Sequence, residues 1–495
     1  MGLYASGMDE VVSRNPATGV EVGRFPAAGA AAVADTVERA RAAGRWWAGL
    51  GFPTRRRHLL RWRALVTRRM TELAELLHAE TGKPVAEGTI ETAAAIGDID
   101  WAARHARRVL APRRVRRVLP VAEASAHLEY RPYGVVGVIG PWNYPVFTPL
   151  GSIAYALAAG NAVVHKPSEH TPAVGQWLAD TFAEVVPEQP VFQTVHGDGE
   201  TGAALCRSGV DKLSFTGSTA TAKQVMAACA ETLTPVVLEA GGKDAMIVDV
   251  DADLDAAAEA CVWGAFTNAG QTCVGIERAY VAGEVYDGFL SRVVARAAAL
   301  TVGADGTADL GPIITPAQLA VVRRHIEDAL DRGAKAVLGG REAVQPPYVH
   351  PTILVDVPPD ALAAREETFG PTLVVHRVES MAEALRLAND TAYGLGGAVF
   401  GKAQAIRLAR GLRAGMATVN DVLSFAGMSS LPWGGLGASG IGRLRGEDGL
   451  REFAHAKSIV VRRAPSVLRS RTFERTERDI ARIVAAYRLR YGRRP

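Results

Sequence analysis

The sequence predicts an α/β protein with a doubly wound parallel sheet, followed by a second α/β unit. Three observations predict this fold class. Short apolar runs alternate with helix-like stretches from residue 135 to residue 239, the alternation resumes after Gly241, and glycine- or proline-rich turns follow several of the apolar runs. Such alternation is typical of a parallel sheet with crossover helices, in which ligands bind beyond the carboxyl ends of the strands.

The elements follow in chain order. Ala, Leu, Arg and Glu recur with helical spacing through most of the first 110 residues, which predicts helices at 31–47, 54–80 and 85–110. Residues 127–131 alternate as a strand does. Buried strands are expected at 135–139, 162–165, 191–195, 212–215 and 236–239, with helices up to 159 and at 172–186.

The second unit begins after Gly241. Helices are expected at 253–268, 285–300 and 316–332, and strands at 279–281, 352–355, 372–376 and 417–420. Residues 424–442 are rich in Gly, Ser and Pro, which predicts a long functional loop. Residues 473–491 predict a basic helix on or beside the body.

Composition excludes several classes of protein. The chain has 495 residues, 48% of them hydrophobic and 22% charged, as in soluble globular proteins of two or three structural units. Its four cysteines are unclustered, which argues against a disulfide framework and a metal site and favours a cytoplasmic location. Neither a signal peptide nor an apolar run that could span a membrane is expected.

Charge is concentrated in the tail. The net charge is +4, but residues 464–495 carry nine arginines against three acidic residues, so the rest of the chain is close to −2. This distribution gives no support to nucleic-acid binding. The tail could pack on a neighbouring subunit or touch an acidic membrane surface, and its apolar positions are too few for firm anchoring: Ile480, Ile483, Val484 and Tyr487.

Cys273 is the cysteine with a functional setting. It follows Gly270, Gln271 and Thr272, so an accessible thiol there could attack a carbonyl carbon, although a buried core cysteine is the more ordinary outcome.

Polar residues follow the first two strands of the predicted sheet. Asn143 could donate to an oxyanion or cap the next helix. Lys166 and Glu169 could contact the ribose of a nucleotide or form a charged turn.

Three further turns carry candidate residues. Residues 215–219 place a glycine turn before a helix, which suits a pyrophosphate. Glu239 ends an apolar strand before two glycines, where a carboxylate is costly unless it is used, for example as a general base. Residues 366–371 pair acids with an aromatic residue before a tight turn, and an exposed turn is the alternative.

Together these strings resemble the aldehyde dehydrogenase superfamily over residues 15–461. The matching motifs, in order, are Pro-Trp-Asn-Tyr-Pro at 141–145, Lys-Pro-Ser-Glu at 166–169, Phe-Thr-Gly-Ser at 215–218, Leu-Glu-Ala-Gly-Gly-Lys at 238–243, Gly-Gln-Thr-Cys at 270–273 and Glu-Thr-Phe-Gly-Pro at 367–371, joined by Asn420 and the glycine-rich residues 432–440.

The resemblance implies NAD(P)-dependent oxidation of a small-molecule aldehyde to a carboxylic acid. Cys273 would form a thiohemiacetal and then a thioester, Asn143 and the Cys273 backbone N–H would hold the oxyanion, and Glu239 would activate the hydrolytic water. The cofactor residues that carry over are Trp142, Lys166, Glu169, Gly199, Phe215, Gly217, Ser218, Glu367 and Phe369. Because Glu169 would repel a 2′-phosphate, NAD is expected, and NADP stays open.

The resemblance also implies a domain plan. A Rossmann-like NAD-binding domain would span 1–118 and 135–239, a catalytic α/β domain 240–442, a small antiparallel oligomerisation arm 119–134 and 443–463, and a basic extension 464–495. The arm implies a homodimer or homotetramer.

Departures from the family pattern bear on the substrate. Leu444 stands where many members carry a glutamate, residues 146–153 contain no arginine for a distal carboxylate, and residue 275 is Gly rather than a second cysteine. An apolar or aromatic aldehyde is therefore expected, with Tyr144, Phe147 and Phe425 as pocket wall or as ordinary core. The alternatives are a succinate-semialdehyde dehydrogenase, a CoA-acylating enzyme, which would lack Glu239, and a catalytically inactive binding protein of the same fold.

Overall fold

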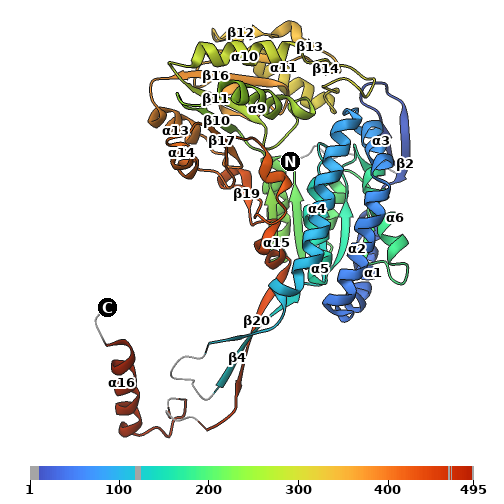
Figure 1. Cartoon of the computed structure of the whole chain (residues 1–495). Coiled ribbons are helices and arrows are strands. Elements are labelled where there is room, and N and C mark those ends of the chain that lie inside the picture. Colours follow the sequence, from blue (N-terminus) through green and yellow to red (C-terminus); the bar gives the residue numbers. More distant parts are fainter. Residues whose placement is uncertain (1–9, 117–123, 466–468, 470, 493–495) are drawn as a thin grey trace.

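The computed structural model describes residues 10–116, 124–465, 469 and 471–492. It contains two mostly parallel sheets, each covered by helices, and an antiparallel arm that projects from the body (Figure 1). The α/β fold class is confirmed. The proposed domain limits remain predictions; residues 119–123 of the expected arm, and residues 1–9 and 117–118 of the expected NAD-binding domain, lie outside the described residues.

The first sheet has the order β19-β9-β8-β5-β6-β7. Strands β5 to β9 run parallel, as expected, and the short β19 adds an antiparallel edge from the late loop. The strands are β5 (Val135–Ile139), β6 (Ala162–Lys166), β7 (Phe192–Thr194), β8 (Lys212–Thr216), β9 (Val236–Glu239) and β19 (Gly440–Ile441).

Helices from both ends of the chain cover this sheet. They are α1 (Ala30–Gly49), α2 (Gly51–Arg68), α3 (Met70–Thr81), α4 (Val85–Leu110), α5 (Phe147–Ala159), α6 (Pro172–Val185), α7 (Gly199–Arg207), α8 (Thr219–Ala230) and α15 (Gly446–Glu452). Helix α5 is apolar on all sides and buried, as its Ala-rich sequence requires.

The second sheet has the order β12-β15-β16-β11-β10-β17-β18. Its strands are β10 (Asp244–Val248), β11 (Ile276–Ala282), β12 (Lys335–Leu338), β15 (Thr352–Val355), β16 (Thr372–Val378), β17 (Gly397–Phe400) and β18 (Thr418–Val419). Its helices are α9 (Leu254–Phe266), α10 (Tyr286–Ala298), α11 (Pro316–Asp331), α12 (Leu362–Arg365), α13 (Met381–Asn389) and α14 (Ala405–Gly411).

The arm joins distant parts of the chain. Strand β4 (Ala124–Pro132) pairs antiparallel with β20 (Ala454–Arg462) and with the short β3 (Arg113–Val115). Beyond it, α16 (Glu477–Tyr491) stands away from the body (Figure 1) and begins at a capping box of Thr476 and Asp479. Within the described residues, no helix is long and apolar enough to cross a membrane.

Several smaller elements complete the fold. They are the hairpins β1 (Glu10–Arg14) with β2 (Glu21–Pro26) and β13 (Val344–Gln345) with β14 (Tyr348–Val349), and the 3-10 turns η1 (Thr267–Gly270), η2 (Arg341–Ala343), η3 (Ser424–Gly427) and η4 (Gly437–Ser439).

One predicted helix is wrong in its extent. Residues 54–80 form two helices that meet at Arg69, whose φ of −105° and ψ of 19° leave the helical region. No Gly or Pro marks this break. Arg69 instead turns its guanidinium between Glu72 and Glu184, so tertiary contacts set the bend.

Candidate active site

The chain turns sharply just before Cys273. Asn268, Ala269 and Gly270 all have positive φ, of 53°, 53° and 71°. Such a conformation is costly for the first two residues. Gly270 is required, because a Cβ there would lie 2.2 Å from the carbonyl of Gly370. The turn therefore brings Cys273 out of η1 in a fixed direction.

Two polar side chains hold this turn. Gln271 donates from Nε2 to the carbonyls of Asn268 (3.0 Å) and Pro312 (3.2 Å), and its Oε1 accepts from the N–H of Ile314 (2.9 Å). From α4, Glu87 Oε1 accepts from the N–H of Asn268 at 2.8 Å. These bonds offset the strain of the left-handed residues.

Cys273 lies on the wall between two cavities. Of the four cysteines, all in the described part of the chain, it alone is partly exposed, so it is not an ordinary core cysteine. One cavity of about 300 Å³ and another of about 500 Å³ both reach it. Burial, with a smaller contribution from nearby carboxylates, raises the pKa of its thiol, which is therefore neutral in the resting protein.

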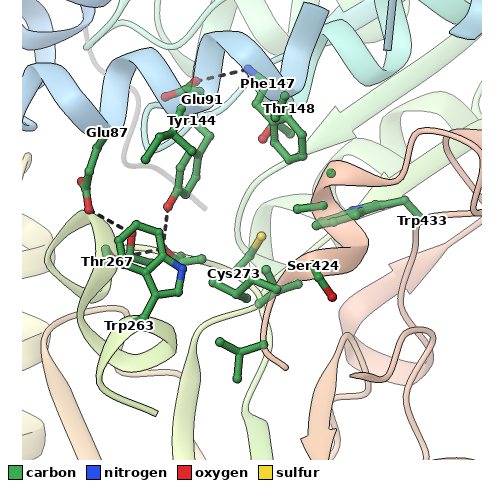
Figure 2. Close-up of a pocket in the computed structure, with 18 residues that line it drawn as sticks. Glu87, Glu91, Tyr144, Phe147, Thr148, Trp263, Thr267, Cys273, Ser424 and Trp433 are labelled. Carbon is green, nitrogen blue, oxygen red and sulfur yellow. Dashed lines mark hydrogen bonds between the residues drawn. The ribbon is translucent and has the colours of Figure 1, made fainter. Parts of the chain in front are cut away.

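The smaller cavity is apolar and aromatic. Figure 2 shows the Cys273 sulfur directed into a space bordered by Tyr144 and Phe147 on one side and Trp433 on the other. Phe425, for which pocket wall and ordinary core were both open, does not line it and belongs to the core, where its ring packs against Trp433 at 5.6 Å.

No lysine or arginine is among the residues that line this cavity. The guanidinium of Arg445 lies behind its aromatic wall. It lies 3.9 Å from the centre of the Phe147 ring and pairs with Asp98 at 3.1 Å.

Asn143 is buried beside Cys273 and lines the larger cavity with it. Its Nδ2 donates to the carbonyl of Gln271 at 2.9 Å, and no described residue accepts its second hydrogen. It does not cap α5, whose N-cap is Val146. The backbone N–H of Cys273 also has no acceptor among the described residues. Two N–H donors are therefore available next to the thiol.

A buried ion pair beneath Asn143 was not predicted from the sequence. Lys83 donates from Nζ to Glu91 (2.6 Å) and to the carbonyl of Asn143 (2.7 Å), and Glu91 Oε1 accepts from the N–H of Val146 (2.8 Å). The pair fixes the loop that carries Asn143. Lys83 in the turn between two predicted helices and Glu91 in the second helix carry no signal that distinguishes them from solvated residues.

Glu239 ends β9 in a buried position. Neither carboxyl oxygen has a hydrogen-bond partner among the described residues, and Oε1 lies against Gly434, where a Cβ would be 2.9 Å away. Burial raises its pKa to about 8, and the charges of Arg443 and Arg445 oppose this only in part. Its side chain lines neither cavity at Cys273, so it must turn to meet a water there.

The larger cavity lies beyond the carboxyl ends of β5, β8 and β9. Of the predicted cofactor residues it is lined by Trp142, Gly217, Ser218, Glu367 and Phe369. Ser218 caps α8 by accepting from the N–H of Thr221 at 3.2 Å, so the positive end of that helix borders the cavity. Phe215 does not line it, and its ring packs under Gly217, where a Cβ would lie 2.6 Å from it.

Lys166, Glu169 and Gly199 also lie outside this lining. Lys166 is buried and donates to the carbonyl of Pro167 at 3.0 Å, with Glu169 Oε2 3.7 Å from its Nζ. The Glu169 side chain is 40% exposed and therefore accessible to a ligand. Gly199 begins α7 behind the cap formed by Asp198.

Glu367 belongs to a partly buried turn, in which Glu366 alone is fully on the surface, rather than to the exposed turn that was the alternative. Its Oε1 accepts from the N–H of Gly242 at 2.9 Å, and burial raises its pKa to about 8. Glu277, which is paired with Lys243, accepts from the N–H of Phe369 at 2.9 Å and so holds the turn. The Phe369 and Trp142 rings meet edge to face at 5.4 Å.

These residues fit a nicotinamide dinucleotide. A glycine turn and a helix N-terminus suit the pyrophosphate, the accessible carboxylate of Glu169 suits ribose hydroxyls, and the cavity extends to the thiol.

Comparison with known proteins agrees with this geometry. The model of the aldehyde dehydrogenase family matches residues 4–459. A 4,4'-diapolycopene aldehyde oxidase of Methylomonas sp is 38% identical over 92% of this chain and 87% of its own. A putative succinate-semialdehyde dehydrogenase [NADP(+)] of Mycolicibacterium smegmatis is 37% identical over 90% of this chain and 87% of its own.

Solved structures share the fold as well. The Mycobacterium tuberculosis aldehyde dehydrogenase complexed with NAD+ superposes with a TM-score of 0.87 at 34% identity, over 92% of this chain and 95% of that one. The chain belongs to the aldehyde dehydrogenase family, whose NAD(P)-dependent enzymes oxidise aldehydes to acids.

Proposed function

We propose that this enzyme oxidises neutral apolar or aromatic aldehydes with NAD, and that Cys273 is its nucleophile. The observation that carries the proposal is the position of Cys273, which is partly exposed between an apolar cavity and a polar cavity at the strand ends. An aldehyde in the first cavity and a nicotinamide in the second would both reach the same sulfur.

The first step forms a bond between Sγ of Cys273 and the carbonyl carbon. The partly exposed thiol first gives its proton to solvent water; the thiolate then bonds to the carbonyl carbon, and the carbonyl oxygen becomes the oxyanion of a thiohemiacetal. The free hydrogen of Asn143 Nδ2 and the backbone N–H of Cys273 would stabilise that oxyanion. Lys83 keeps Asn143 in place through its carbonyl.

Bound NAD(P) supplies the acceptor for the hydride that leaves the former aldehyde carbon. Ser218 and the start of α8 would hold its pyrophosphate, Glu367 its nicotinamide ribose, and Lys166 with Glu169 its adenosine ribose. Collapse of the oxyanion leaves an acyl thioester on Cys273.

Glu239 would complete the reaction as general base. Its carboxylate takes a proton from water, the hydroxide oxygen bonds to the acyl carbon, and the thiolate of Cys273 leaves with the electron pair. Since neither carboxyl oxygen has a partner of normal hydrogen-bond geometry, the side chain gives up only a weak contact with Trp433 when it turns toward the thioester.

The substrate class follows from the lining. A distal carboxylate would be buried without a cation, which costs several kcal/mol. The diapolycopene aldehyde named for one relative is consistent with an apolar substrate, whereas other relatives are named as succinate- or glutarate-semialdehyde dehydrogenases. Succinate semialdehyde is therefore the second candidate.

NAD is proposed over NADP because of Glu169. Its exposed carboxylate would accept from ribose hydroxyls and would repel a 2′-phosphate. The NADP-linked name of one relative makes NADP the alternative to be tested.

A panel of aldehydes tests the proposal. NADH or NADPH formation is followed by absorbance with hexanal, benzaldehyde and succinate semialdehyde, each with NAD and with NADP. We expect the first two with NAD to give the highest kcat/KM. A preference for succinate semialdehyde would favour the second candidate, and no reduction with any aldehyde would contradict the proposal.

We also propose that the arm of β4 and β20 assembles a homodimer or homotetramer in the cytoplasm. Its edges and outer face are exposed, and α16 lies beyond it with an apolar stripe. Light scattering at the monomer mass would contradict this assembly.

A further inference from the structure

Another apolar cavity, distinct from the two that reach Cys273, adjoins the smaller of those two. It is called the second cavity below, and the smaller cavity at Cys273 is called the first. The second cavity has a volume of about 500 Å³ and lies between the start of α4, helix α9, the end of α10 and the loop at residues 306–310. Its apolar lining includes Val262, Phe266, Leu300 and Leu310. The proposed reaction does not use this cavity.

The two cavities share part of one wall. Four residues line both of them: Glu87, Ile90, Trp263 and Thr267. Ile90 is 55% exposed and Trp263 is 45% exposed, although both are large apolar side chains. Ile90 comes from α4 and Trp263 from α9. Exposed apolar side chains at such a junction are typical of a surface that contacts a ligand.

The charges of the second cavity exclude an anionic ligand. Its single basic residue, Arg296, pairs with Asp255 at 3.3 Å. Its other charged residues are the acidic Glu87, Glu259 and Asp309. A neutral hydrocarbon segment would bury the apolar lining and leave the exposed Glu259, Arg296 and Asp309 at the rim. The carboxyl of Glu87 stays on the shared wall, where it accepts from Thr267 and Asn268.

The volumes of the two cavities also favour a neutral hydrocarbon chain that extends from one into the other. The cavity at Cys273, with about 300 Å³, is at the lower limit for ligand pockets, whereas the two cavities together approach the upper part of that range. A short aldehyde fills the first cavity, and only a longer chain reaches the second.

We propose that the second cavity binds the distal hydrocarbon of an elongated, uncharged aldehyde whose carbonyl lies at Cys273 and whose chain passes between Ile90 and Trp263. This inference rests on the proposed function and names the length of its substrate. Each methylene buried beyond the first cavity then increases kcat/KM by up to about fourfold.

Linear aldehydes from butanal to hexadecanal, assayed with NAD, test the proposal together with Ala86→Trp. Ala86 is exposed near the start of α4 and lines only the second cavity of the two. We expect the wild-type kcat/KM to increase with chain length, and Ala86→Trp to lower it at least tenfold for dodecanal while butanal changes less than twofold.

Ala93→Trp is the matched control. Ala93 is exposed on the same helix and lines neither cavity, so both substrates should keep their wild-type kcat/KM. Ala308→Trp fills the cavity from the opposite loop and replaces Ala86→Trp if that variant loses activity toward butanal.

The failures of the two proposals are distinguishable. Activity that stops increasing at butanal or hexanal, or tryptophan variants that affect short and long aldehydes equally, would overturn the second-cavity assignment and leave the proposed reaction intact. No NADH from any aldehyde would overturn both.

Discussion

The two cavities that meet at Cys273 are built in different ways. The larger one is formed by turns at strand ends, where Gly217, Ser218 and Gly241 bring backbone close to the ligand space. The smaller one is formed by side chains from α4, α5, α9 and the late loop. Backbone sets the shape of the larger cavity, and side chains set the shape of the smaller one. Substitutions should therefore change the choice of aldehyde more readily than the choice of dinucleotide.

Loss of the sulfur that both cavities share should stop turnover. We expect Cys273→Ala to reduce the rate of NADH formation by on the order of 10⁴-fold or more, because no other described nucleophile lines both cavities. Steady-state absorbance measures the rate. NAD binding, followed by calorimetry, should persist, and an unchanged rate would exclude Cys273 as nucleophile.

Glu239→Gln should separate the two half-reactions. Thioester hydrolysis should slow by about 10² to 10⁴-fold, so that rapid mixing shows a burst of one NADH per active site followed by slow turnover. The absence of a burst, with both phases slowed equally, would place Glu239 before the thioester.

The pH dependence has a defined sign. A general base must be deprotonated, and burial raises the pKa of Glu239 to about 8. In the wild type, kcat should therefore increase as the pH rises through about 8, and it should fall below that value as the carboxyl is protonated. A flat profile from pH 6 to 9, where hydrolysis limits the rate, would contradict this role.

Asn143→Ala should slow the chemical step more than it weakens binding of aldehyde or NAD in the two cavities. Removal of one oxyanion donor typically lowers kcat by about 10² to 10³-fold. The KM values for aldehyde and for NAD should change little. Asn143→Asp has the same size but lacks the amide donor, and activity close to wild type in that variant would exclude the oxyanion role.

Glu169→Gln should alter the dinucleotide side alone, with the smallest effect. Loss of the charge removes its repulsion of a 2′-phosphate, and we expect the preference for NAD over NADP to fall by about tenfold. The relative kcat/KM of hexanal and benzaldehyde should stay constant. A change in that ratio would mean that the two cavities are not independent.

The same contrast explains what the sequence could predict. Motifs with glycine or a strand end placed Cys273, Asn143, Gly217 and Ser218 near one another, because backbone geometry restricts the residue types there. The apolar run 135–139 likewise predicted β5 within its observed limits.

Side-chain packing was less predictable. Lys83 and Glu91 form a buried pair, yet in sequence Lys83 looks like an exposed turn residue and Glu91 like a solvated helix residue. Strand β17 escaped prediction because Gly397 shortens its apolar run, and β10, whose apolar run begins only after Asp244, was missed as well. For Phe425 the sequence left pocket wall and core both open, because aromatic character does not distinguish the wall from the layer behind it.

The central claim is that an acyl group is carried by Cys273. Its most direct test is mass spectrometry of Glu239→Gln after one turnover with NAD and hexanal. We predict one hexanoyl group per chain on the peptide that contains Cys273, in a stoichiometry equal to the NADH released. NADH release without an acyl group, or an acyl group on another residue, would contradict the account.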